Sequence, residues 1–111
     1  MTKYLILYHA PTTPADAAPP TQAEMDAATG QWNAWAGRVG DRMVDFGTPL
    51  AVGVRVTRDG TSASSREVAG YSIIEADDLP AALELTESHP HLAMPGATEI
   101  EVHEAMAVPG M

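Results

Sequence analysis

The sequence contains no cysteine, few aromatic residues and few basic ones. The lack of cysteine excludes disulfide bonds, thiolate metal sites and a cysteine nucleophile, and it is typical of proteins from a reducing compartment. Lysine and arginine together number 6 against 15 aspartates and glutamates, which gives a formal net charge of −9. Nucleic acids and anionic membranes are bound by clustered basic side chains, so this charge balance argues against both as partners.

Long apolar runs are also missing. The first apolar run, Tyr4 to Tyr8, is followed at once by His9 and Pro11. A transmembrane helix needs about 20 apolar residues, and a signal peptide also needs a longer apolar stretch than this one. We therefore expect a soluble, cytoplasmic protein. The 111 residues, of which 45% are hydrophobic, predict a single folded domain over residues 1–111.

The order of the hydrophobic patterns predicts the fold class. Strand patterns, helix patterns and turn signals divide the chain into a strand at Lys3–His9, a helix at Thr21–Val39, a second strand that starts near Met43 and continues through Ala51–Thr57, a third strand at Gly70–Ala76, a helix after Asp77 or Asp78 and a last strand at Glu99–Ala105. This β-α-β-β-α-β order is typical of a ferredoxin-like α+β fold with an antiparallel sheet. We expect the first and third strands to lie side by side and parallel at its centre.

Local signals support several of these boundaries. Thr21 and Glu24 form a capping-box pattern at the start of the first helix. Asp59-Gly60 is a hairpin-turn signal. The proline-rich segment 10–20 is a long loop, and long loops in small domains are often functional. Whether it acts as a lid or only as a spacer stays open.

Alternation within the strands predicts a sheet with two different faces. One set is strongly apolar and includes Tyr4, Ile6, Tyr8, Val52, Val54, Val56, Tyr71, Ile73, Ile100 and Val102. The other is mixed and includes Leu5, Leu7, His9, Gly53, Arg55, Ser72, Ile74, Glu101 and His103. The mixed face is too apolar to be fully exposed to solvent and too polar to form an ordinary hydrophobic core. A homodimer that packs sheet against sheet around a partly polar cavity resolves this conflict.

Several segments resemble the YCII-related family, from about residue 2 to 105. They are Lys3 to His9, the Trp32/Trp35 pair, Val44 to Pro49, Asp59-Gly60, Gly70 to Asp78, Ala81 to Glu84 and Glu99 to Val102. The most specific is Gly-Tyr-Ser-Ile-Ile-Glu-Ala-Asp-Asp at Gly70–Asp78. The resemblance implies a dimeric α+β barrel, in agreement with the two-faced sheet.

The family has no established general reaction, but some members are considered enzymes because a helix histidine pairs with an aspartate near the second strand. The first helix of this chain has no histidine, and Trp32 lies near the corresponding place. Asp45 roughly matches the acidic position. The Asp-Gly-Pro-Phe signature of a related branch is also absent, since the comparable stretch is Ser62–Glu67. The family's histidine–aspartate pair therefore cannot be transferred to this chain.

His9 is the best candidate for a catalytic group, because it follows the first strand at the edge of the long loop. With Asp45 or Glu99 beside it, its imidazole can act as a general base near neutral pH. A histidine that only bonds a backbone carbonyl is the structural alternative. The pairing of the strands should place His103 near Tyr4, roughly 16 Å from His9, so the two histidines should not act together.

The remaining candidates concern ligand binding. Trp32 and Trp35 lie one turn apart and form either core packing or the wall of a pocket. Arg55 and Glu101 are candidate cavity charges, and Arg55 can hold an anion bidentately. The alternative is that the two pair with each other or are simply exposed. His89-Pro90-His91 can offer two imidazoles to a metal, but no third ligand is evident, so we expect no metal site.

No phosphate-binding loop, His-Glu-x-x-His or Gly-x-Ser-x-Gly motif is present, and no cofactor is implied. The sequence therefore predicts a homodimer with a small-molecule cavity and two possible functions. One is cofactor-independent acid–base chemistry on a small organic substrate at His9. The other is a non-catalytic ligand-binding or interaction module.

Overall fold

The computed structural model describes residues 1–10, 21–64, 67–93 and 98–109. The elements in chain order are β1 (Thr2–His9), α1 (Gln22–Val39), the short 3-10 helix η1 (Gly40–Arg42), β2 (Met43–Asp45), β3 (Val54–Thr57), β4 (Gly60–Ala63), β5 (Val68–Ala76), α2 (Leu79–Thr86), the 3-10 helix η2 (Pro90–Ala93) and β6 (Glu99–Glu104). The predicted loop at 10–20 lies, apart from Ala10, outside the described residues.

Both helices begin at the predicted caps. Thr21 Oγ1 accepts the amide hydrogen of Glu24 at 3.1 Å, and the Glu24 carboxylate accepts the amide hydrogen of Thr21 at 3.2 Å, which completes the capping box. Asp78 caps α2 by accepting the amide hydrogen of Ala81 at 3.0 Å, and Pro80 lies in the first turn.

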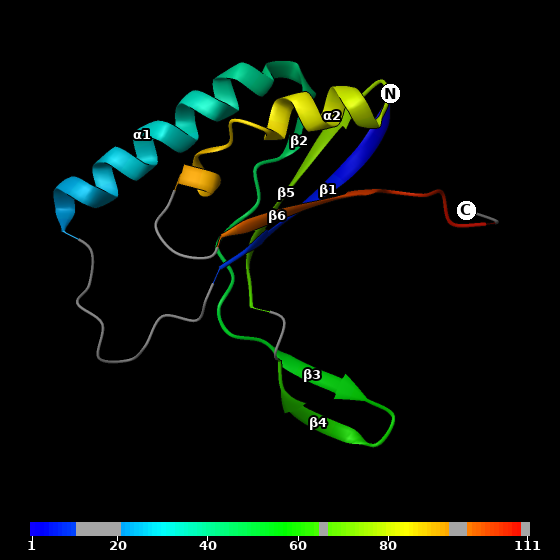
Figure 1. Ribbon diagram of the computed structural model, residues 1–111. Coiled ribbons are helices and arrows are strands. Elements are labelled where there is room, and N and C mark those ends of the chain that lie inside the picture. The colour runs from blue at the N-terminus through cyan, green and yellow to red at the C-terminus, as the bar shows by residue number, and fades with distance from the viewer. Residues whose placement is uncertain (11–20, 65–66, 94–97, 110–111) are drawn as a thin grey trace.

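Four strands form one antiparallel sheet in the order β2-β5-β1-β6, compatible with a ferredoxin-like α+β fold. Figure 1 shows both helices on the same side of this sheet. The strands β1 and β5 are the central neighbours, as expected, but they run antiparallel, with Thr2 opposite Ala76 and Tyr8 opposite Gly70. The expectation of parallel central strands was wrong because the intervening hairpin reverses the chain direction before β5 begins.

The core lies between the sheet and the two helices. Its buried members are Tyr4, Ile6, Tyr8, Trp35, Val39, Ile74, Ala76 and Ala82. The two faces of β1 and β6 are as predicted, but those of β5 are exchanged. Ile73 is opposite Leu5 and Tyr71 is opposite Leu7, so both lie on the face away from the helices. Single-sequence alternation does not fix the register between strands, which is why β5 was assigned to the wrong face.

The region predicted as a long second strand is divided in two. Met43–Asp45 joins the main sheet as β2 and Pro49 forms an isolated bridge with Gly70 of β5, whereas β3 pairs with β4 in a separate hairpin that extends away from the sheet (Figure 1). The turn at Asp59-Gly60 is confirmed. Val52, Val54 and Val56, which were expected in the apolar face of the sheet, are instead 68 to 75% exposed.

The face of the sheet away from the helices carries an apolar centre formed by Leu5, Leu7, Tyr71 and Ile73, and we call the side of the sheet that carries these residues the open face. The molecule measures 46 × 43 × 19 Å, so its thinnest dimension corresponds to one helix layer on one sheet. Its accessible surface is 7943 Å², whereas a compact monomer of this mass exposes about 5900 Å². The chain therefore leaves unusually much surface to solvent.

Candidate functional site

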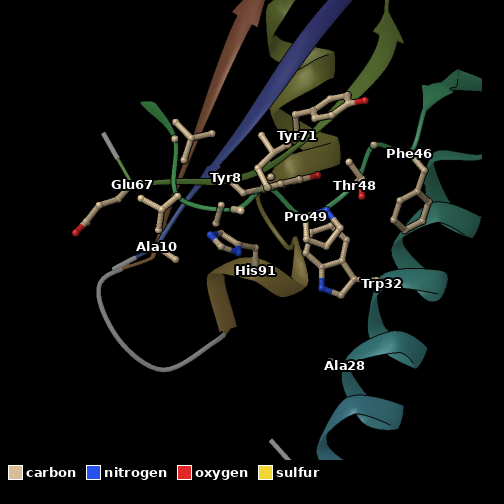
Figure 2. Close-up of a pocket in the computed structure, with 18 of the residues that line it drawn as sticks. Tyr8, Ala10, Ala28, Trp32, Phe46, Thr48, Pro49, Glu67, Tyr71 and His91 are labelled. Atoms are coloured by element: carbon tan, nitrogen blue, oxygen red, sulfur yellow. The ribbon is translucent and has the colours of Figure 1, made fainter. Parts of the chain in front are cut away.

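A cavity of about 1220 Å³ lies on the helix side of the sheet, between α1, the segment 46–54 and the start of β5. Figure 2 shows the residues around it, with Trp32 contributed by α1, Tyr8 by β1 and His91 by η2. Most of its lining is apolar, and the described residues that form it include Tyr8, Ala28, Trp32, Phe46, Pro49, Leu50, Val52, Val68 and His91. Cavities of several hundred Å³ with such linings are typical of small-molecule sites.

Aromatic side chains form one wall of the cavity. The rings of Tyr8 and Trp32 meet edge to face with centroids 5.0 Å apart, and Phe46 lies 6.1 Å from Trp32. Edge-to-face contacts hold aromatic rings in preferred orientations. Trp32 is partly exposed and lines the cavity. It therefore offers a ring face or edge to a bound molecule.

A hydrogen-bond chain fixes Tyr8 at the base of the cavity. The Tyr8 hydroxyl donates to Ser72 Oγ at 2.7 Å, and the Ser72 hydroxyl donates to the carbonyl oxygen of Phe46 at 2.6 Å. Burial raises the pKa of Tyr8 to about 12, against a smaller lowering by the bond to Ser72. Tyr8 is therefore a neutral phenol at physiological pH, and its proton is already committed.

His91 is the second buried polar side chain that lines the cavity. Its Nε2 lies 2.8 Å from the backbone carbonyl oxygen of His9. A carbonyl oxygen can only accept, so Nε2 carries the hydrogen and Nδ1 is left with its lone pair in the neutral ring. The sequence interpretation treated His91 only as a possible metal ligand, because nothing in the local pattern links it to the end of β1.

His89 has a different environment from His91. It is 1% exposed and packs against Tyr8, Trp32 and Trp35, with ring centroids 4.2 to 4.8 Å away. Its Nδ1 accepts the amide hydrogen of His91 at 2.9 Å. Burial lowers the pKa of His89 to about 3, with smaller contributions from His91 and Arg38. His89 is therefore a neutral core residue.

The described residues contain no group of three or more histidine, cysteine or acidic side chains arranged to hold a metal ion. For His89 this agrees with its contacts, since its Nδ1 already accepts a hydrogen bond from the backbone of the other candidate ligand. Its ring is also enclosed by aromatic side chains.

His9 lies on the opposite face of β1 from Tyr8 and pairs with a carboxylate. Its Nε2 is 2.5 Å from Glu101 Oε1, and its side chain is 18% exposed. The candidate Glu99 is directly opposite His9 in the strand register, but His9 forms its ion pair with Glu101, two residues further along β6. A carboxylate-paired imidazole is thus present at the position that the sequence suggested.

His103 corrects a further expectation. It is opposite Leu5 rather than Tyr4, and its Nε2 lies 3.7 Å from Glu101 Oε2. Glu101 therefore lies between His9 and His103 and contacts both imidazoles. The prediction that these histidines do not act together within one subunit rested on their distance along the strand and did not consider the carboxylate between them.

The structure does not bring Asp45 to His9. Asp45 is opposite Ile73, which is itself opposite Leu5, so Asp45 is displaced from His9 by four residues along the sheet, about 13 Å at the usual strand rise. Its carboxylate instead accepts the amide hydrogen of Gly47 at 2.9 Å and the Tyr71 hydroxyl hydrogen at 3.4 Å. Asp45 thus shapes the turn after β2.

Two other candidates lie away from the cavity. Trp35 is 1% exposed and its indole nitrogen donates to the carbonyl oxygen of Leu85 at 2.7 Å, so it is a core residue. Arg55 is an exposed residue of β3, opposite Ser62 in the projecting hairpin. Of the two tryptophans, only Trp32 lines the cavity within the described part of the chain.

Comparison with protein-family models and with curated proteins returned no match. Among the described residues, no helix combines the length and the apolar character needed to cross a membrane.

Proposed function

We propose that the protein binds a small, neutral and largely apolar molecule in the cavity beside α1. The observation that carries this proposal is the cavity itself, about 1220 Å³ in volume and walled by Trp32, Phe46 and Tyr8. Aromatic walls favour a flat ligand because ring faces and edges pack against one another over a large area. The described lining includes no lysine or arginine, which disfavours an anionic ligand.

Titration calorimetry with 2-methoxynaphthalene, a neutral aromatic probe, tests this proposal. We expect saturable binding, weakened at least roughly tenfold in Trp32→Ala because a large ring contact is lost. Met25→Ala is the matched control, since Met25 is an exposed residue of the same helix and is not among the described residues that line the cavity. An absence of saturable binding to the unaltered protein, or equal weakening in both variants, contradicts the proposal.

We further propose that the chain forms a homodimer through the open face. Four apolar side chains lie at the centre of that face, and the described helices cover only its opposite side. The excess of about 2000 Å² over the surface of a compact monomer exceeds the roughly 800 Å² that each partner buries in a standard interface. A second copy presents the same apolar centre, and the two centres can cover each other.

Acid–base catalysis at His9 is the second candidate, and the contact between His9 and Glu101 favours it. A carboxylate beside an imidazole orients the ring and stabilises the imidazolium that forms when the base accepts a proton. His9 is on the open face, so the reaction would take place in the space between this face and the second subunit of the proposed dimer. It requires no cofactor, because the imidazole itself accepts and returns the proton.

Membership of the YCII-related family remains a proposal that rests on the sequence resemblance at Lys3–His9 and Gly70–Asp78. The βαββαβ order of the main-sheet strands and the two α-helices, with the sheet antiparallel, supports it. We also propose a cytoplasmic location, supported by the absence of cysteine and by the acidic composition.

A further inference from the structure

We propose that Nδ1 of His91 is the polar anchor of the cavity, and that the ligand is a neutral aromatic molecule that carries a hydrogen-bond donor, such as a phenol. This inference rests on the proposed binding function and specifies its substrate class. It assigns a recognition role to a residue on η2, away from the His9–Glu101 pair.

The first argument is the fixed tautomer of His91. The bond from Nε2 to the His9 carbonyl oxygen, 2.8 Å long, places the ring hydrogen on that nitrogen. Nδ1 is then an acceptor, and the structure gives it no hydrogen-bond partner among the described residues. The Tyr8 ring lies 5.3 Å away between centroids and limits rotation of the imidazole. His91 is therefore a preoriented acceptor.

The second argument is the distribution of polar groups around the cavity. Tyr8 and His91 are the buried polar side chains of the described lining, whereas Thr29, Asn33, Thr48 and Glu67 are exposed. The Tyr8 hydroxyl already donates to Ser72. The hydrogen of the Tyr8 hydroxyl is therefore not available to a ligand, whereas Nδ1 of His91 is a nitrogen acceptor on a buried side chain of the lining. Buried acceptors discriminate strongly between ligands with and without a matching donor.

The third argument is charge. With the ring hydrogen on Nε2, the lone pair at Nδ1 accepts an O–H or N–H group from a ligand. The described lining contains Glu67 and no lysine or arginine, so it holds no permanently cationic side chain for an anion. An aromatic ring with one neutral donor fits both the walls and the anchor.

Two naphthalene derivatives test the anchor. 2-Naphthol has an O–H donor, and 2-methoxynaphthalene has nearly the same shape without that donor. We expect the unaltered protein to bind 2-naphthol roughly tenfold more tightly in titration calorimetry, which corresponds to about 1.4 kcal/mol.

Two substitutions separate the nitrogens of His91. Glutamine carries its amide N–H near the place of Nε2 and can keep the bond to the His9 carbonyl, but it has no acceptor at Nδ1. Asparagine carries an oxygen near the place of Nδ1. We therefore expect His91→Gln to abolish the preference for 2-naphthol and His91→Asn to retain it. The readout is the ratio of the two affinities within each variant, so a general loss of affinity from the smaller side chain does not alter the comparison.

The outcomes separate this inference from the binding proposal. If neither compound binds the unaltered protein, the proposed function fails and the anchor fails with it. If both bind with equal affinity, or if His91→Gln keeps the preference, the anchor is wrong while binding in the cavity stands. Circular dichroism and thermal unfolding of each variant exclude loss of the fold as the cause.

Discussion

His91 donates a hydrogen bond from Nε2 to the backbone carbonyl oxygen of His9, with the two atoms 2.8 Å apart. This bond joins the turn after α2 to the last residue of β1. Consecutive strand residues face opposite sides, so Tyr8 lines the cavity while the His9 side chain meets Glu101 on the open face. The cavity and the His9–Glu101 pair are therefore built on one short segment.

Gly47→Ala should destabilise the protein by at least about 2 kcal/mol. Gly47 has φ of 81°, and a Cβ atom there would lie 1.7 Å from the Tyr71 carbonyl oxygen, so the backbone between β2 and β5 has to move. Gly30→Ala is the control, because Gly30 is an exposed residue of α1 and a Cβ atom there has no neighbour within 4 Å. This substitution should stabilise the folded protein by roughly 0.5–1 kcal/mol. Urea unfolding measures both values, and a neutral Gly47→Ala contradicts the close approach.

Stability should fall between about pH 6.5 and pH 3 because of His89. Its pKa is lowered to about 3 in the folded protein, whereas the ordinary value of 6.5 applies after unfolding. As the pH falls, the unfolded state therefore binds the proton before the folded state does. The contribution of neutral His89 to the free energy of unfolding is fully present above pH 6.5 and is lost progressively below it. The limiting slope for one group is about 1.4 kcal/mol per pH unit. Urea unfolding at pH 7.5, 6.5 and 5.5 measures the slope.

The matched control for this pH dependence is His89→Asn. Asparagine can still accept the amide hydrogen of His91 through its side-chain oxygen, but it does not titrate. We expect the variant to be less stable at pH 7.5 because ring contacts with Trp32 and Trp35 are lost. Its stability should nevertheless depend less on pH between 7.5 and 5.5. An equal slope in both proteins shows that another group is responsible.

His9→Ala should lower the turnover of any substrate found for this protein by roughly 10²- to 10⁴-fold, because the general base is removed. Glu101→Gln should lower it less, since the imidazole stays but loses the charge that orients it. His103→Ala is the control, because His103 lies on the other side of Glu101 at 3.7 Å. Steady-state kinetics with the three variants measure these effects. Full activity of His9→Ala eliminates the catalytic mechanism.

Much of the fold could be predicted from local pattern. The capping box at Thr21, the cap at Asp78 and the turn at Asp59-Gly60 depend on interactions between near neighbours, and each is found as expected. The face of β5 was mispredicted because register is a relation between distant segments. The valines of segment 51–57 were assigned to the wrong sheet, because alternation predicts that a segment forms a strand but not which sheet that strand joins.

The candidate site was less predictable than the fold. Proximity to the end of β1 singled out His9 as a candidate, and its ion pair in the structure is with Glu101 rather than with Asp45 or Glu99. Which carboxylate approaches depends on side-chain reach across paired strands. His91 was missed as a cavity residue because its contact with the His9 carbonyl joins segments 82 positions apart. No spacing rule along the chain contains that information.

Leu7→Asp should convert the proposed dimer into a monomer. Leu7 is opposite Tyr71 on one side and Glu101 on the other, at the centre of the open face, so a carboxylate there adds charge beside Glu101 within the proposed interface. Light scattering after size-exclusion chromatography should give twice the 11.7 kDa chain mass for the unaltered protein and 11.7 kDa for the variant. Met25→Asp, on the exposed part of α1, should leave the mass unchanged. A monomeric unaltered protein, or a dimer that survives Leu7→Asp with its fold intact, rejects the open face as the interface.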